Sequence, residues 1–194
     1  PYTVALDVLK AGADSITVHL REDRRHINDM DLKILSSDKA IPINLEIASD
    51  LKIVKIALKN KPSFICLVPE KRNEITTEGG LNLKKNKNKI KKILEIFNSN
   101  NIRTSLFINP SIQDIKLSKT LGSKCIEIHT GKISNKIKEK KNYSRELNKI
   151  KKCATYANKI GLEVHAGHGM DYKTTKILNK IKQIEEFNIG HFII

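Results

Sequence analysis

Residues 125–129, Cys125-Ile126-Glu127-Ile128-His129, form a short run in which apolar and polar side chains alternate. A run of this length that is rich in β-branched residues predicts a β-strand. Six further strand-length runs recur along the 194-residue chain. The seven predicted strands span residues 16–20, 43–47, 64–68, 104–108, 125–129, 162–166 and 191–194.

Between the predicted strands lie longer segments whose apolar residues recur with helical spacing. One of these segments follows Ser49-Asp50, a helix-starting pair, and another ends at Gly161, a typical C-cap residue. The positions that carry the spacing are Ile53, Ile56 and Ala57; Ile90, Ile93, Leu94 and Phe97; and Leu147, Ile150, Ala154, Ala157 and Ile160. Strand and helix therefore alternate along the chain.

This alternation predicts an α/β fold of parallel strands joined by right-handed crossovers. Seven such strands without a dinucleotide glycine fingerprint favour a (β/α)8 TIM barrel over an open sheet. Because a complete barrel takes about 250 residues, residues 1–194 predict a single partial TIM-barrel domain that lacks the first strand and the last helix. The chain begins at Pro1 and ends on an apolar run, and we expect it to be part of a longer enzyme.

The composition is that of a globular protein, with 39% hydrophobic and 29% charged residues. No apolar run reaches the roughly 20 residues of a membrane span. We therefore expect no membrane partner. Cys66, Cys125 and Cys153 lack the paired spacing of a disulfide framework or a zinc site, so we expect free, buried thiols and no metal. Free thiols fit a reducing compartment, and we expect a cytoplasmic protein.

The net charge of +15 raises the alternative of a basic module that binds nucleic acid. The lysines gather at residues 84–89 and 136–141, which we expect on helix faces or in loops, and aromatic residues make up only 5% of the chain. A nucleic-acid motif and a platform of stacking aromatics are both missing from the sequence. This pattern favours a solvated basic surface, and we expect no nucleic-acid partner.

Polar side chains near the ends of three predicted strands break the apolar pattern expected of strands that are buried on both faces. The side chains that share one face within each run are Thr17, His19 and Arg21; Asn44 and Glu46; and Glu127 and His129. At the carboxyl ends of barrel strands, such side chains point into the mouth where active sites form. The pattern therefore predicts an acid–base site.

Two glycine-containing stretches fit the same end of the barrel: Ala166-Gly167-His168-Gly169, and Asn188-Ile189-Gly190-His191, which opens the last predicted strand. Glycines there let backbone N–H groups approach a phosphate closely. In TIM barrels the loops after the seventh and eighth strands are the usual phosphate site. His165 we interpret as a structural histidine. The long, charged loop 69–80 ends in two glycines and is typical of a lid that closes over substrate.

The ten residues 17–26, TVHLREDRRH, resemble the signature of the pyridoxine 5'-phosphate synthase family, the ring-closing enzymes of vitamin B6 synthesis. The resemblance extends over the whole chain in ordered motifs. These motifs are Asn44-Leu45-Glu46, Leu67-Val68-Pro69-Glu70-Lys71-Arg72, Thr76-Thr77-Glu78-Gly79-Gly80, Ser105-Leu106-Phe107-Ile108, Ile126-Glu127-Ile128-His129-Thr130-Gly131, Ala166-Gly167-His168-Gly169 and Asn188-Ile189-Gly190-His191.

The resemblance implies condensation of 1-deoxy-D-xylulose 5-phosphate with 3-amino-2-oxopropyl phosphate, with release of phosphate and water and without a metal or organic cofactor. It implies that His19 and Glu46 accept protons. It also implies that His168 donates a proton and that Glu127 assists proton transfer or stabilises charge. The implied binding residues are Arg21, His26 and Thr76 for the deoxyxylulose phosphate, and Gly169, Gly190 and His191 for the aminoketone phosphate. Schiff-base formation, enolisation, elimination and aldol closure are proton transfers that need such acids and bases.

The family further implies a homo-octamer and, on its first strand, an Asn, an Asp-His pair and an Arg that this chain does not contain. We expect activity to depend on those residues. Two other classes stay open: a different phosphate-handling barrel enzyme, such as an isomerase or aldolase, and the nucleic-acid module. No predicted strand carries a lysine placed for a Schiff base, which argues against an aldolase.

Overall fold

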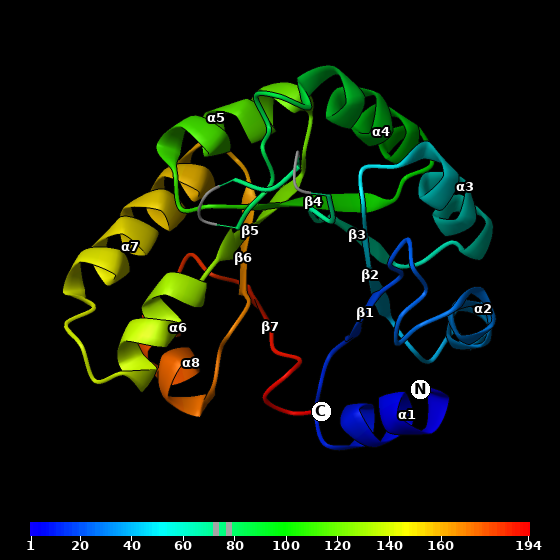
Figure 1. The fold of residues 1–194 in the computed structure, drawn as a ribbon, viewed down its shortest axis with the longest axis horizontal. Coiled ribbons are helices and arrows are strands. Elements are labelled where there is room, and N and C mark those ends of the chain that lie inside the picture. Colours follow the sequence, from blue (N-terminus) through cyan, green and yellow to red (C-terminus); the bar gives the residue numbers. More distant parts are fainter. Residues whose placement is uncertain (72–73, 77–78) are drawn as a thin grey trace.

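A parallel, nearly closed barrel is the frame of this protein, as seen in a computed structural model that describes residues 1–71, 74–76 and 79–194 (Figure 1). Within those residues seven strands pair in sequence order, each parallel to the next. They are β1 (Ile16–His19), β2 (Ile43–Ile47), β3 (Phe64–Leu67), β4 (Arg103–Ile108), β5 (Cys125–His129), β6 (Glu163–Gly167) and β7 (Glu186–Asn188). The predicted TIM-barrel fold class is confirmed.

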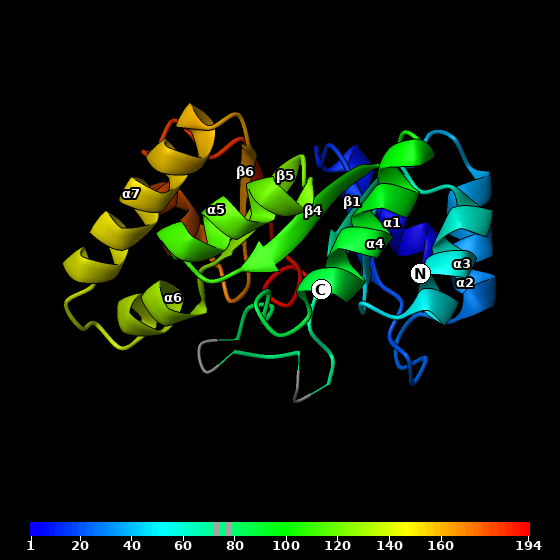
Figure 2. The same ribbon diagram turned by 90° about the horizontal axis from the view of Figure 1, so that it is seen from above.

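Helices form an outer arc around the strands in Figure 1. The helices of the described residues are α1 (Tyr2–Lys10), α2 (Asp29–Ser37), α3 (Leu51–Asn60), α4 (Lys87–Ser99), α5 (Ile112–Leu121), α6 (Gly131–Lys138), α7 (Ser144–Lys159) and α8 (Tyr172–Leu178). None of them is long and apolar enough to cross a membrane. In Figure 2 the described residues between β3 and α4 and the C-terminal residues both lie on the side toward which the β4 arrow points.

The helix signals in the sequence act as expected. The carboxylate of Asp50 caps α3 by accepting a hydrogen bond from the backbone N–H of Lys52 at 2.8 Å. Gly161 follows the C-cap of α7 with φ of +73°, a left-handed conformation that glycine adopts without strain. The apolar positions predicted for α4 are all fully buried: Ile90, Ile93, Leu94 and Phe97.

The main apolar core lies between the outer faces of the strands and the helices. Side chains on the inner faces of the strands are mostly polar, and the small apolar cluster among them consists of Cys66, Val68 and Phe107. This arrangement explains the polar positions within the strand runs, because they point into the barrel. All three cysteines are buried and free, as predicted.

The prediction of a strand at residues 191–194 is wrong. The last strand is β7, Glu186–Asn188, and residues 191–194 are exposed and follow its carboxyl end. Among the described residues this apolar run pairs with no strand, and Phe192 contacts the ring of Tyr172 edge to face at 5.0 Å. Gly190 and His191 therefore lie beyond the carboxyl end of a strand, where barrel active sites form, and do not open one.

A cluster of ionisable side chains joins the amino-terminal ends of β4, β6 and β7. Arg103 forms ion pairs with Glu163 and, at 3.2 Å, with Glu186. The buried His165 lies between the same carboxylates, with Nε2 2.8 Å from Glu163 and Nδ1 3.4 Å from Glu186. These contacts support the interpretation of His165 as structural.

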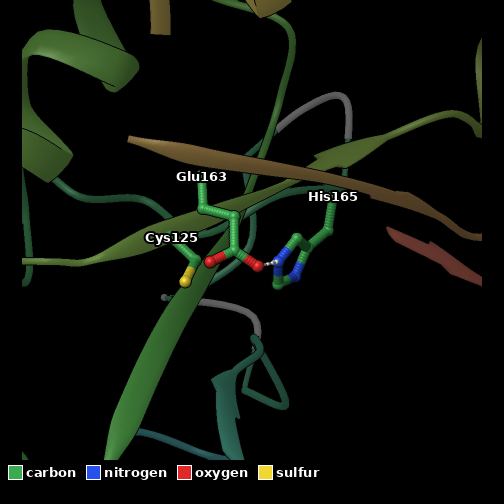
Figure 3. Close-up of side chains that lie close together, drawn as sticks. All are labelled: Cys125, Glu163 and His165. Atoms are coloured by element: carbon green, nitrogen blue, oxygen red, sulfur yellow. Dashed lines mark hydrogen bonds and ion pairs between the residues drawn. The ribbon is translucent and has the colours of Figure 1, made fainter. Parts of the chain in front are cut away.

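The same cluster brings Cys125, Glu163 and His165 close enough to share a metal ion (Figure 3). Burial opposes ionisation of Glu163, yet the contacts with His165 and Arg103 hold the pKa of its carboxyl below the usual range. Glu163 is thus already engaged by Arg103 and His165, and burial raises the pKa of the Cys125 thiol to about 12. This geometry favours an ion-pair cluster that fastens the base of the barrel.

Replacing Arg103 with glutamine should destabilise the fold without affecting turnover. Because the guanidinium group is part-exposed, we expect the free energy of unfolding to fall by about 1–2 kcal/mol. This value lies between the contributions of surface and of buried salt bridges. The pKa of Glu163 is lowered in the folded state. The difference in stability between wild type and variant should therefore be present at neutral pH and shrink as the pH falls through the folded-state pKa of Glu163. Urea unfolding of both proteins measures it. Equal stabilities at neutral pH would contradict the role of this cluster.

Candidate active site

His19 lies at the carboxyl end of β1, between two carboxylates. Its Nε2 atom is 2.9 Å from Oε1 of Glu70, and its Nδ1 atom is 3.6 Å from Oε2 of Glu46. Glu46 is the register partner of His19 on β2. Glu70 follows β3, and its second oxygen accepts a hydrogen bond from the backbone N–H of Glu22 at 3.0 Å. Burial raises the pKa of Glu46, and the nearby His19 opposes this shift. The imidazole is thus within hydrogen-bond distance of Glu70 and within ion-pair distance of Glu46.

Glu127 lies on β5 and points into the barrel, with 2% of its surface exposed. Burial raises the pKa of its carboxyl from 4.5 to about 8, and the negative charge of Glu46 acts in the same direction. Its Oε2 atom accepts hydrogen bonds from Cys66 Sγ at 3.5 Å and from Asn188 Nδ2 at 3.0 Å. A carboxyl with this pKa can both give and take a proton near neutral pH.

His168 follows β6 and stacks on His129 with ring centroids 4.7 Å apart. Phe107 of β4 contacts the ring of His129 edge to face at 5.2 Å. The Thr130 hydroxyl lies 2.7 Å from the carbonyl oxygen of Gly167 and 2.8 Å from that of His168, and so fixes the loop. Burial and, secondarily, the charge of Lys138 lower the pKa of His168. A bound phosphate dianion would oppose this shift and favour the protonated form.

The three glycines at this end of the barrel differ in their surroundings. Gly169 has φ of +73°, whereas a Cβ added there would meet Ser134 at an ordinary 3.5 Å, so backbone conformation is what favours glycine. A Cβ added at Gly190 would project into open space, with no atom within 4 Å. At Gly167 a Cβ would lie 2.0 Å from Oε1 of Glu127, so any side chain there would displace the Glu127 carboxyl.

The residues implied for the deoxyxylulose phosphate lie in the loops after β1 and β3. Arg21 is part-exposed and pairs with Asp23, with Nε 3.1 Å from the carboxylate. Thr76 accepts a hydrogen bond from the side-chain amide of Asn109. His26 is exposed, with φ of +74°. Within the described ranges, no hydrogen bond or ion pair joins either His26 or His191 to the other candidate residues.

The predicted lid falls partly outside the described residues, since Arg72, Asn73, Thr77 and Glu78 are not among them. Its described end lies over the site: a Cβ at Gly79 would be 3.1 Å from Nε2 of His129. At Gly80 a Cβ would be 2.5 Å from the backbone nitrogen of Asn109. The close approach of this segment to the strand ends therefore depends on two glycines.

Sequence reasoning did not assign roles to four residues that the structure places at the site. Glu70, His129 and Asn188 all stood within the quoted motifs, and His129 was among the polar strand-end side chains, but none of them was given a role. Asn109 follows β4 and binds the backbone N–H of Gly80 at 3.1 Å. A signal was available for His129 and Asn188, because each lies on the inward face, two residues from another inward side chain.

A nearly closed barrel of parallel strands with imidazoles and carboxylates at the carboxyl ends has the architecture of a TIM-barrel enzyme. The family model described as "Pyridoxal phosphate biosynthesis protein PdxJ" matches residues 1–194. A pyridoxine 5'-phosphate synthase of Pelagibacter ubique is 62% identical over 194 residues, which are 100% of this chain and 81% of the relative. One from Sulfurihydrogenibium sp. is 48% identical over 197 residues, covering 100% of this chain and 80% of the relative. The chain belongs to the PdxJ family, the pyridoxine 5'-phosphate synthases of vitamin B6 biosynthesis.

Solved structures with low sequence identity share the fold. 3-Keto-L-gulonate-6-phosphate decarboxylase from Vibrio cholerae aligns with a TM-score of 0.67 at 13% identity, covering 97% of this chain and 81% of that one. Phosphoribosyl anthranilate isomerase from Thermus thermophilus aligns with a TM-score of 0.64 at 9% identity, covering 97% and 82%. At such identities the likeness supports the TIM-barrel architecture alone.

Proposed function

We propose that this chain condenses 1-deoxy-D-xylulose 5-phosphate with 3-amino-2-oxopropyl phosphate to form pyridoxine 5'-phosphate, phosphate and water by acid–base catalysis. The observation that carries the proposal is the pair of proton-transfer groups at the strand ends. His19 lies between Glu46 and Glu70, and Glu127 is a buried carboxyl whose pKa lies near 8. Ring closure from two carbonyl compounds requires several proton transfers, which such groups perform.

In this proposal His19 and Glu46 remove protons from the substrate carbons. The two groups lie 3.6 Å apart, close enough to act on the same substrate. Glu127 assists proton transfer or stabilises developing charge, since its carboxyl changes protonation state near neutral pH. His168 donates a proton to a leaving oxygen. Its side chain is exposed at the barrel mouth, where substrate can reach it.

The substrates' phosphate groups need cations and backbone donors. We propose that Arg21, His26 and Thr76 hold the deoxyxylulose phosphate and that Gly169, Gly190 and His191 hold the aminoketone phosphate. The loops after β6 and β7 support the second assignment, because they occupy the usual phosphate position in barrels. Inorganic phosphate, a product, should compete at that position.

Gly190→Val should raise the KM for the aminoketone phosphate by about tenfold, the effect of losing one modest contact to a charged group. A branched side chain would block the approach of a phosphate, yet a Cβ at Gly190 meets no protein atom within 4 Å. The melting temperature should therefore stay unchanged. Steady-state kinetics with each substrate varied in turn measure the effect.

Gly169→Val is the control for backbone strain, because Gly169 has φ of +73° and the variant should lower stability as well. An equal rise in both KM values for Gly190→Val would contradict separate phosphate positions.

Growth of a bacterium that lacks its own pyridoxine 5'-phosphate synthase tests the proposal in a cell. The complete gene for this protein should restore growth without added pyridoxine. The same gene with Glu127→Gln, which removes the titrating carboxyl, should not. Absence of growth with soluble, folded wild-type protein would count against the function.

Location and assembly belong to the same proposal. We propose a cytoplasmic homo-octamer, in keeping with the family resemblance. Light scattering of the purified complete protein should give about eight times the monomer mass, as a closed symmetric assembly requires. A monomer would contradict this part of the proposal while leaving the reaction untouched.

A further inference from the structure

The carboxyl group of Glu127 has a supporting contact that the proposed reaction does not by itself require. Asn188 of β7 donates from Nδ2 to Oε2 of Glu127 at 3.0 Å and to Oε1 of Glu186 at 3.3 Å. Its Oδ1 atom accepts a hydrogen bond from the Thr17 hydroxyl at 2.8 Å. The Thr17 hydroxyl thus takes up the amide oxygen of Asn188, and the amide turns its NH2 group toward both glutamates.

Gly167 makes this contact possible. Glu127 lies on β5 and Asn188 on β7, with β6 between them. A Cβ at Gly167 would lie 2.0 Å from Oε1 of Glu127 and 3.2 Å from Cβ of Asn188. Because Gly167 carries no side chain, the carboxyl from one strand and the amide from the other meet directly across β6.

We infer that Asn188 and Gly167 are positioning residues for Glu127: the amide of Asn188 holds the carboxyl in place, and Gly167 leaves the space that it occupies. This inference rests on the proposed function, in which Glu127 takes part in proton transfer. Neither residue touches the reacting atoms. A shift of the carboxyl by about 1 Å is enough to cost 10²-fold in rate, so the two residues should affect turnover strongly.

The amide of Asn188 also affects the protonation of Glu127. The titratable groups that face Glu127 are Glu46 from β2, Cys66 from β3 and Glu186 from β7. Hydrogen bonds from Cys66 and Asn188 oppose the raised pKa of Glu127, which burial, Glu46 and Glu186 cause. On β6, His165 contacts Glu186. Replacing the neutral donor at position 188 with a carboxylate should therefore make Glu127 hold its proton to a higher pH.

Asn188→Asp is the sharpest variant, because it keeps the shape of the side chain and an oxygen for Thr17 while removing the N–H donor. In the complete protein, kcat should fall by about 10–100-fold, the loss expected from a misplaced catalytic group, with both KM values within about twofold of wild type. The 13C NMR titration of the Glu127 carboxyl should move upward by about one pH unit or more. Gly167→Ala should lower kcat similarly.

Thr17→Val is the matched control. It removes the hydrogen bond that Thr17 donates to Asn188 but no contact of Glu127, so it tests whether Asn188 merely joins β7 to β1. Stability should fall, while kcat and the Glu127 titration should stay near wild type. If Asn188→Asp does not fold, Asn188→Ser removes the amide with less change in charge and replaces it in the series.

A double-mutant cycle completes the test. In a Glu127→Gln background, Asn188→Asp should cost little additional kcat, because the group that Asn188 positions is already gone. Additive losses, or an unchanged Glu127 titration in Asn188→Asp, would overturn the inference. The NMR titration needs no substrate. It therefore still tests Asn188 if wild-type protein makes no pyridoxine 5'-phosphate, a result that would refute only the proposed function.

Discussion

Replacing His19 with asparagine should lower turnover by about 10²–10⁴-fold, the usual effect of losing a general acid–base group. Asparagine retains the ability to hydrogen-bond Glu70, which lies 2.9 Å from Nε2 of His19, but it cannot take up a proton. The fold should be preserved, since His19 is part-exposed at the end of β1. The measurement is kcat in the complete protein with both substrates saturating.

Glu70→Gln provides a companion to this variant. It keeps a side chain of the same shape beside His19 and removes only the negative charge, so we expect a smaller loss of kcat, about tenfold. Near-normal turnover in His19→Asn, with an unchanged melting temperature, would remove His19 from the proton-transfer groups.

Replacing His168 with asparagine should lower turnover by about 10²–10³-fold, because the variant cannot protonate a leaving oxygen. His168 has φ of +77°, a conformation that asparagine tolerates better than most residues. The variant should therefore keep the loop conformation. It should also keep the contacts of the Thr130 hydroxyl, which involve only the backbone carbonyl oxygens of Gly167 and His168. Measurement of kcat and of the thermal melt separates lost chemistry from lost structure.

Chemical rescue sharpens the test of His168. His168→Gly also tolerates the positive φ, and the exposed position leaves room for a small molecule. Added imidazole should restore part of the activity of His168→Gly and none of the activity of His19→Asn, which retains a side chain in its place. Turnover of His168→Asn close to wild type would contradict the donor role.

The strand and helix pattern could be predicted because burial dictates it locally. In the runs that form β2 and β5, polar side chains alternate with apolar ones, and the two kinds lie on opposite faces of the strand. The apolar positions of α4 face the core as their spacing requires. Polar residues within the runs correctly indicated the inner face, since an outward position would place them against the helices.

The last strand was misplaced for a physical reason. Glu186-Phe187-Asn188 carries two polar residues because both point into the polar barrel interior, where they meet His165 and Glu127. Apolar content instead favoured Phe192-Ile193-Ile194, which is exposed. Local propensity contains no information on which partner a strand will pair with, so tertiary context decided the outcome.

Only part of the geometry of the candidate site could be predicted from the sequence. His19 and Glu46 meet as the strand-end pattern predicted. The contact of His19 with Glu70 joins residues 51 positions apart through a loop, and no periodicity encodes it. Gly167 was assigned to phosphate binding, whereas its close neighbour is the carboxyl of Glu127. Such pairings depend on the register of three strands, which a single sequence does not specify.

The most direct test of the central claim is formation of product by the purified complete protein from the two proposed substrates. We predict that pyridoxine 5'-phosphate and inorganic phosphate appear in equal amounts when 1-deoxy-D-xylulose 5-phosphate and 3-amino-2-oxopropyl phosphate are both present. Neither should appear when one substrate is omitted, and both should form far more slowly when His19→Asn replaces the wild type. Folded wild-type protein that releases phosphate without forming pyridoxine 5'-phosphate, or that forms neither, would contradict the account.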